Sequence, residues 1–206
     1  MGKHAHSIDV QVLRRIAGKG EGWVFTPAAF ADLGSRTAID LALMRQKRAA
    51  KIRQLARGLY DYPRRHPTLG VLAPSLEAVA EALKGSEAIR LQPSGAYAAN
   101  LLGLSEQVPL KVVFLTDGAS RRVALGKQEL ILKRTTPRNM ATAGKVSGLV
   151  IQALRHMGRR NLDDSMVRTL RKRLKESDKK QLIKDLRYAP AWIADVMRKI
   201  AAPASN

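Results

Sequence analysis

The chain has 206 residues, of which 45% are hydrophobic, and it contains no cysteine. This length and apolar content suffice for one compact core or two small ones, while the lack of cysteine excludes disulfide cross-links and thiolate metal sites. Lysine and arginine number 37 against 17 aspartates and glutamates, and the formal charge of +20 attracts polyanions, so nucleic acid is the first partner to consider.

The positive charge is concentrated toward the two ends of the chain. Residues 1–69 carry a net charge of +8, residues 70–140 carry +3, and residues 141–206 carry +9. No stretch approaches the roughly 18 apolar residues of a membrane span, and the N-terminus lacks the apolar segment of a signal peptide. We therefore expect a soluble, cytoplasmic protein without a membrane partner.

The first elements in the chain are expected to be helices separated by short breaks. Apolar residues recur at helical spacing over residues 7–17 and predict a first helix. Thr26 is placed to cap a second helix with Pro27 at its first position. Gly34 then ends that helix and Ser35 caps a third, so the sequence predicts a helix-turn-helix.

The third helix, which follows Ser35, has one face of small and apolar residues and one polar face. Plotted at 100° per residue, the inward face consists of Ala38, Ile39, Ala42, Leu43 and Gln46. The outward face holds Thr37, Asp40 and Met44, flanked by Arg36, Lys47 and Arg48. A strand over residues 51–56, a turn at Gly58 and a strand over residues 59–62 then predict a wing, with Arg53 and Arg57 beside it.

This unit is therefore interpreted as a winged helix-turn-helix whose third helix enters the major groove of DNA. The expected base contacts are Arg36, Thr37 and Asp40. The expected contacts to the DNA backbone are Ser35, Lys47, Arg48 and Arg57, with Arg53 included among the DNA-binding residues. The alternative is that this helix face is simply solvated, in a winged domain that serves protein contacts.

Proline and glycine break the pattern over residues 63–74 and predict a linker, with a domain boundary near residue 70. We expect domains at 1–69 and 70–206. The second domain is predicted to mix helices (from Ser75, and over 94–103) with strands (88–91, 110–116, 123–125 and 129–133). It then continues as helices over 146–157, 163–175 and 177–188, with a last helix from Pro190. The fold class is α+β: a winged helix-turn-helix, then a mixed α/β domain that ends in a helical C-terminal region.

Motifs for catalysis or metal binding are weak in this sequence. No closely spaced carboxylate pair follows Gly34 and Ser35 to hold magnesium, and the four histidines lack zinc-ligand spacing. The glycines over residues 18–22 lack the flanking features of a phosphate-binding loop. We expect no enzymatic activity, no cofactor and no metal, and we expect the basic run over residues 171–180 to be a solvated face.

Three separated segments resemble a known prokaryotic family. PSGAYAANLLGLSEQVPLKVVFLTDG (Pro93 to Gly118), ARGLYDYPR (Ala56 to Arg64) and ALRHMG (Ala153 to Gly158) occur in the order found in antitoxins of the AbiE type, the antitoxin half of type IV toxin-antitoxin systems. The resemblance extends from about residue 8 to residue 160.

The resemblance implies a bacterial protein of two parts. The N-terminal winged domain would bind double-stranded operator DNA and repress its own operon, and the remainder would neutralise a toxin similar to nucleotidyltransferases, with or without direct contact. The alternative is a winged-helix transcriptional regulator or an RNA-binding protein that has no toxin partner.

Overall fold

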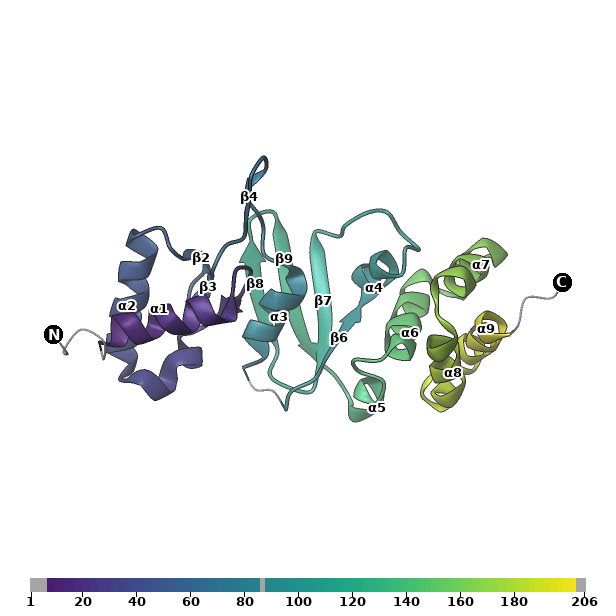
Figure 1. The fold of residues 1–206 in the computed structure, drawn as a ribbon. Helices are drawn as coiled ribbons and strands as arrows, with labels where there is room; N and C mark the ends of the chain where they lie inside the picture. The colour runs from purple at the N-terminus through teal and green to yellow at the C-terminus, as the bar shows by residue number, and fades with distance from the viewer. Residues whose placement is uncertain (1–6, 86–87, 203–206) are drawn as a thin grey trace. The chain divides into compact units, whose positions relative to one another are not determined.

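The computed structural model describes residues 7–85 and 88–202, and the chain divides into two compact units. Unit 1 is Met1–Gly85 and unit 2 is Ser86–Asn206 (Figure 1). The fold is mixed α+β, with helices toward both ends of the chain. We expected the boundary after residue 69, whereas the structure has it at Gly85, because the helix α3 (Leu76–Lys84) contacts the strand β1 (Val24–Phe25) of unit 1.

Unit 1 combines helices with a three-stranded antiparallel sheet in the order β1-β3-β2. Serine side chains begin its α-helices: Ser7, Ser35 and Ser75 each accept a hydrogen bond from the backbone N–H three residues later. In chain order its other elements are α1 (Ile8–Lys19), the 3₁₀ helix η1 (Pro27–Leu33), α2 (Arg36–Arg48), β2 (Arg53–Ala56), β3 (Leu59–Asp61), β4 (Arg65–His66) and β5 (Gly70–Val71).

The core of unit 1 is apolar and partly aromatic. Phe25 and Phe30 meet edge to face with ring centroids 5.4 Å apart, and Trp23 covers both rings. Helices α1 and α2 complete this core with Val12, Ile16, Ile39, Ala42 and Leu43. The core thus joins α1, η1 and α2 to β1.

Two predictions for unit 1 differ from the structure in detail. The expected second helix is the 3₁₀ helix η1, and Thr26 precedes it in extended conformation without a side-chain cap. The expected linker over residues 63–74 contains the short antiparallel pair β4 and β5. Proline and glycine are common both in tight hairpins and in linkers, so composition alone does not distinguish a hairpin from a linker.

Unit 2 contains a four-stranded mixed sheet in the order β6-β7-β9-β8. The strands are β6 (Leu91–Ser94), β7 (Lys111–Thr116), β8 (Arg121–Leu125) and β9 (Gln128–Arg134). Strand β7 runs parallel to β9 and antiparallel to β6, and β8 pairs with β9 at the edge. These strands agree with the predicted ones except that β6 begins at Leu91, where a strand over residues 88–91 was expected.

The helices of unit 2 lie on the β6 side of the sheet, as Figure 1 shows for this unit. They are α4 (Gly95–Leu101), α5 (Pro137–Met140), α6 (Val146–Met157), η2 (Arg159–Asn161), α7 (Asp164–Arg173), α8 (Glu176–Lys184), η3 (Leu186–Tyr188) and α9 (Ala191–Ala201). Ala98 and Ala99 of α4 are fully buried against this helical core, which also includes Leu154, Leu170 and Ile193. Small side chains let α4 approach α6 closely.

A buried polar contact joins α6 to the end of α8. The Ser147 hydroxyl donates to a carboxylate oxygen of Asp185 over 2.5 Å, and the Gln181 side-chain amide donates to the same oxygen over 2.7 Å. Burial by itself would raise the pKa of Asp185, but these two hydrogen bonds and the Lys145 ammonium outweigh it, so the pKa is lowered. Asp185 is therefore a structural carboxylate.

Candidate nucleic-acid interface

Helix α2 has the two faces that its sequence predicts. Ile39, Ala42, Leu43 and Gln46 are buried, so the expected inward face is confirmed except that Ala38 is half-buried. The exposed side chains include those of Arg36, Thr37, Lys47 and Arg48. The polar side of α2 therefore faces away from the core of unit 1.

The N-terminal turn of α2 presents polar and charged groups. Ser35 caps the helix through a 3.3 Å hydrogen bond from the Ala38 N–H. Arg36 and Asp40 form an ion pair one turn apart with 2.8 Å between Nε and Oδ2, and their side chains are 69% and 46% exposed. Exposed pairs of this kind contribute little to stability, so both groups remain free to exchange partners.

The hairpin of β2 and β3 lies beside this turn of the helix. Burial and the nearby Asp40 carboxylate raise the pKa of Tyr60 in β3, and the Arg36 guanidinium opposes that shift. At the other end of α2, the Lys47 ammonium donates to the Gln54 side-chain oxygen of β2 over 2.7 Å. Both ends of α2 thus have a neighbour in the hairpin.

The hairpin turns through Arg57 and Gly58. Gly58 has φ of 70°, a left-handed conformation that suits glycine and closes the two-residue turn. The pairing also shifts register between Gln54 and Ala56, a bulge that bends the strand. Arg57 is exposed at the tip of the hairpin.

Arg53 has partners inside unit 1 that the sequence did not reveal. Its guanidinium forms a two-pronged contact with Asp61, with donor–acceptor distances of 3.1 and 2.6 Å, and it also donates to the backbone oxygen of Leu72. Asp61 is 1% exposed, whereas the Arg53 side chain is 35% exposed. Two of the three guanidinium nitrogens of Arg53 are therefore engaged in holding β2 to β3 and to the chain after β5.

Two further ion pairs orient α1 toward η1 and α2. Arg15 of α1 binds Asp32 of η1 through two contacts of 2.6 Å each, and Arg45 of α2 binds Asp9 of α1 over 2.6 Å. The hydrogen bond from Arg15 lowers the pKa of Asp32 to about 2. A Cβ added to Gly34 would lie 2.7 Å from Cδ1 of Ile8, so the break between η1 and α2 also lies against α1.

A family model described as "Family of unknown function (DUF6088)" matches residues 11–182. The chain belongs to this family. The DUF6088 match begins within α1, ends within α8, and takes in all eight candidate residues as well as most of unit 2. A comparison with curated proteins finds no match.

The described part of this DUF6088 member shows neither a metal-binding cluster nor a membrane-spanning helix. Among residues 7–85 and 88–202, no three histidine or acidic side chains come together to hold a metal ion. Within the same residues, no helix has both the length and the apolar character needed to cross a membrane.

The basic run over residues 171–180 lies on α7, α8 and the turn between them. Leu174 is buried, and the exposed cations around it are Lys172, Arg173, Lys175 and Lys180. Lys179 pairs with Glu176 over 2.7 Å. Most side chains of this run are therefore exposed, which fits a solvated face and a binding surface equally.

Proposed function

We propose that unit 1 is a winged helix-turn-helix domain that binds double-stranded DNA with α2 as its recognition helix. The observation that carries the proposal is the exposure of Arg36 and Thr37 at the N-terminal turn of a helix whose other face is buried. The β2–β3 hairpin, with Arg57 at its tip, has the position of a wing after that helix. Together they offer a helix for the major groove and a cation for the adjacent backbone.

In this proposal the exposed residues of α2 have separate tasks. Arg36, Thr37 and Asp40 face base edges, where an arginine fork reads guanine and a carboxylate reads cytosine. Lys47, Arg48 and Arg57 bind phosphates, and Ser35 fixes the start of the helix beside the DNA backbone. Arg53 is better explained as the partner of Asp61 that positions the wing.

We also propose that the chain is the antitoxin of a type IV-like system, which represses its own operon and neutralises a nucleotidyltransferase-like toxin. The support is the resemblance of three ordered segments to AbiE-type antitoxins. In the structure the segment over residues 93–118 forms the end of β6, α4, β7 and the turn after it, and the segment over residues 56–64 includes β3.

The DNA-binding part is tested by a salt titration on the upstream promoter fragment. The variant Arg36→Ala with Arg48→Ala is compared with the control Lys180→Ala with Lys184→Ala, which removes the same charge from exposed positions of α8. The first variant is expected to bind more weakly, with a salt slope smaller by about one unit for each phosphate that it no longer binds. Unchanged affinity, or an equally large weakening in the control, would overturn the assignment to α2.

The toxin-neutralising part is tested in cells that express a nucleotidyltransferase-like neighbour from the same operon. The wild-type chain is expected to restore growth. The Arg36→Ala with Arg48→Ala variant is expected to restore growth as well while it loses repression of the promoter. Failure of the wild-type chain to rescue growth would leave a DNA-binding regulator without a toxin partner.

A further inference from the structure

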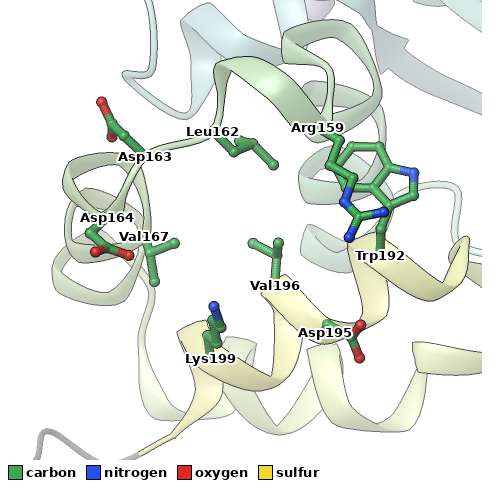
Figure 2. A pocket seen from close by; sticks show the side chains of 9 residues that line it. All are labelled: Arg159, Leu162, Asp163, Asp164, Val167, Trp192, Asp195, Val196 and Lys199. Carbon is green, nitrogen blue, oxygen red and sulfur yellow. The ribbon is translucent and has the colours of Figure 1, made fainter.

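A pocket of about 450 Å³ lies between the start of α7 and α9 in unit 2. Its lining residues, shown in Figure 2, are Arg159, Leu162, Asp163, Asp164, Val167, Trp192, Asp195, Val196 and Lys199. They come from η2, the segment between η2 and α7, α7 itself and α9. The volume falls in the range of pockets that hold small organic ligands.

Four apolar side chains form part of the pocket wall. Leu162, Val167 and Val196 point into it from three sides, and the indole of Trp192 forms a further wall (Figure 2). All four side chains are half-buried and pack on the helical core of unit 2. Their positions are therefore fixed by the fold, and their remaining surfaces are left to the pocket.

Two cations also line the pocket. In Figure 2 the Lys199 ammonium points toward the middle of the pocket, and the Arg159 guanidinium lies beside Trp192 on the other side. Both side chains are exposed, and among the described residues neither has an ion-pair partner. Two cations without ion-pair partners beside apolar side chains favour an occupant with a negative group.

The lining also holds three carboxylates. Asp163 accepts hydrogen bonds from the Ser165 hydroxyl and the Met166 N–H as the cap of α7. Asp195 pairs with Arg198 over 2.6 Å. Two of the three carboxylates are therefore engaged with partners of their own, and the third, Asp164, is exposed.

We propose that this pocket binds a small organic anion that carries one aromatic ring and one negatively charged end group. The ring lies against Trp192 between the aliphatic side chains, where aromatic contact adds to apolar burial. The end group binds Arg159 and Lys199. A nucleoside monophosphate and an aromatic carboxylic acid share this chemistry, and the site is independent of the DNA-binding proposal because all its residues belong to unit 2.

The test uses the full chain with Trp23→Phe, which leaves Trp192 as its one tryptophan. AMP and phenylacetate are titrated, with the uncharged adenosine and phenylacetamide as matched controls, and Trp192 emission is followed. Each anion is expected to give a saturable change with a Kd on the order of 0.1 mM, at least tenfold tighter than its uncharged partner. The tighter of the two anions identifies the source of the ligand.

Three variants check that binding occurs in this pocket. Arg159→Gln and Lys199→Gln should each weaken AMP or phenylacetate about tenfold, because each removes one charge-assisted contact. Lys184→Gln on α8 removes an exposed charge elsewhere and should change nothing. Val196→Phe should abolish binding at an unchanged melting temperature, because its ring fills the space.

Three results would overturn the proposal. The first is that neither anion gives a saturable change in Trp192 emission up to 10 mM, roughly a hundred times the expected Kd. The second is that charged and uncharged probes bind equally well. The third is that Lys184→Gln and Lys199→Gln weaken binding equally.

Discussion

Replacement of Arg53 separates a structural role from a DNA contact. The variant Arg53→Met keeps most of the aliphatic stem but removes the guanidinium from Asp61, which is 1% exposed. Loss of one partner from a fully buried ion pair costs about 3–5 kcal/mol. Because a third of the Arg53 side chain is exposed, water can reach the vacated position, and we expect the free energy of unfolding of unit 1 to fall by about 2–3 kcal/mol.

The assay is urea unfolding followed by Trp23 fluorescence in a Trp192→Phe background, so that unit 1 alone is reported. Trp23 packs on Phe25 and Phe30 and should change its emission when their core opens. The double variant Arg53→Met with Asp61→Leu replaces both charges by apolar groups and should recover most of the loss. Arg53→Lys should stay destabilised, because an ammonium cannot make the two-pronged contact.

The reasoning would be refuted if Arg53→Met unfolded within about 0.5 kcal/mol of the parent, the range of ordinary surface changes, while its affinity for promoter DNA fell. That outcome would support the original assignment of Arg53 to the DNA-binding residues. Loss of stability without a matching loss of DNA affinity at low temperature would instead place it among the residues that position the wing.

Three further predictions concern other positions. Because Arg15 holds the pKa of Asp32 at about 2 in the folded state, against roughly 4 when unfolded, this contact stabilises unit 1 above pH 4 and is lost as pH falls toward 2. Asp32→Asn should therefore lower stability at pH 6 and flatten its acid dependence in Trp23-monitored urea unfolding; identical pH profiles would contradict this. A Cβ at Gly148 would lie 2.3 Å from the Thr142 carbonyl oxygen and 2.4 Å from Oε1 of Gln92, so Gly148→Ala should destabilise unit 2 by about 1–3 kcal/mol. Gly18→Ala lies in open space within α1 and should stabilise unit 1 by about 0.5–1 kcal/mol. Calorimetric melting compares the Gly148→Ala and Gly18→Ala variants with the wild-type chain. A wild-type melting temperature for Gly148→Ala would refute the predicted clash.

Local patterns predicted many of the elements in this chain. The inward face of α2 follows from residues spaced at helical intervals, so Ile39, Ala42 and Leu43 were assigned correctly. Strand β7 was predictable because a run of valine and other apolar residues ends at the turn formed by Asp117 and Gly118, where the Gly118 N–H donates to the Thr116 hydroxyl. These features depend only on neighbours in the sequence.

Features that depend on pairing between separate elements were missed. Nothing in the local sequence tells that Arg53 meets Asp61, or that Arg45 meets Asp9. The shifted start of β6 has the same origin: Arg90 is bound to Asp117 through both its backbone N–H and its side chain, which holds it outside the strand. The pocket beside Trp192 was also missed, because its walls come from segments about thirty residues apart.

The strand order of unit 2 has a consequence for the newly made chain. Strand β6 can pair with β7 as soon as both have left the ribosome, but the other edge of β7 must wait for β9, since β8 is synthesised first and ends up at the border of the sheet. Until β9 arrives, the unpaired backbone edge of β7 is open to other nascent chains, a state prone to aggregation. Translation pauses after β7 should therefore lower the yield of folded protein more than pauses after β9.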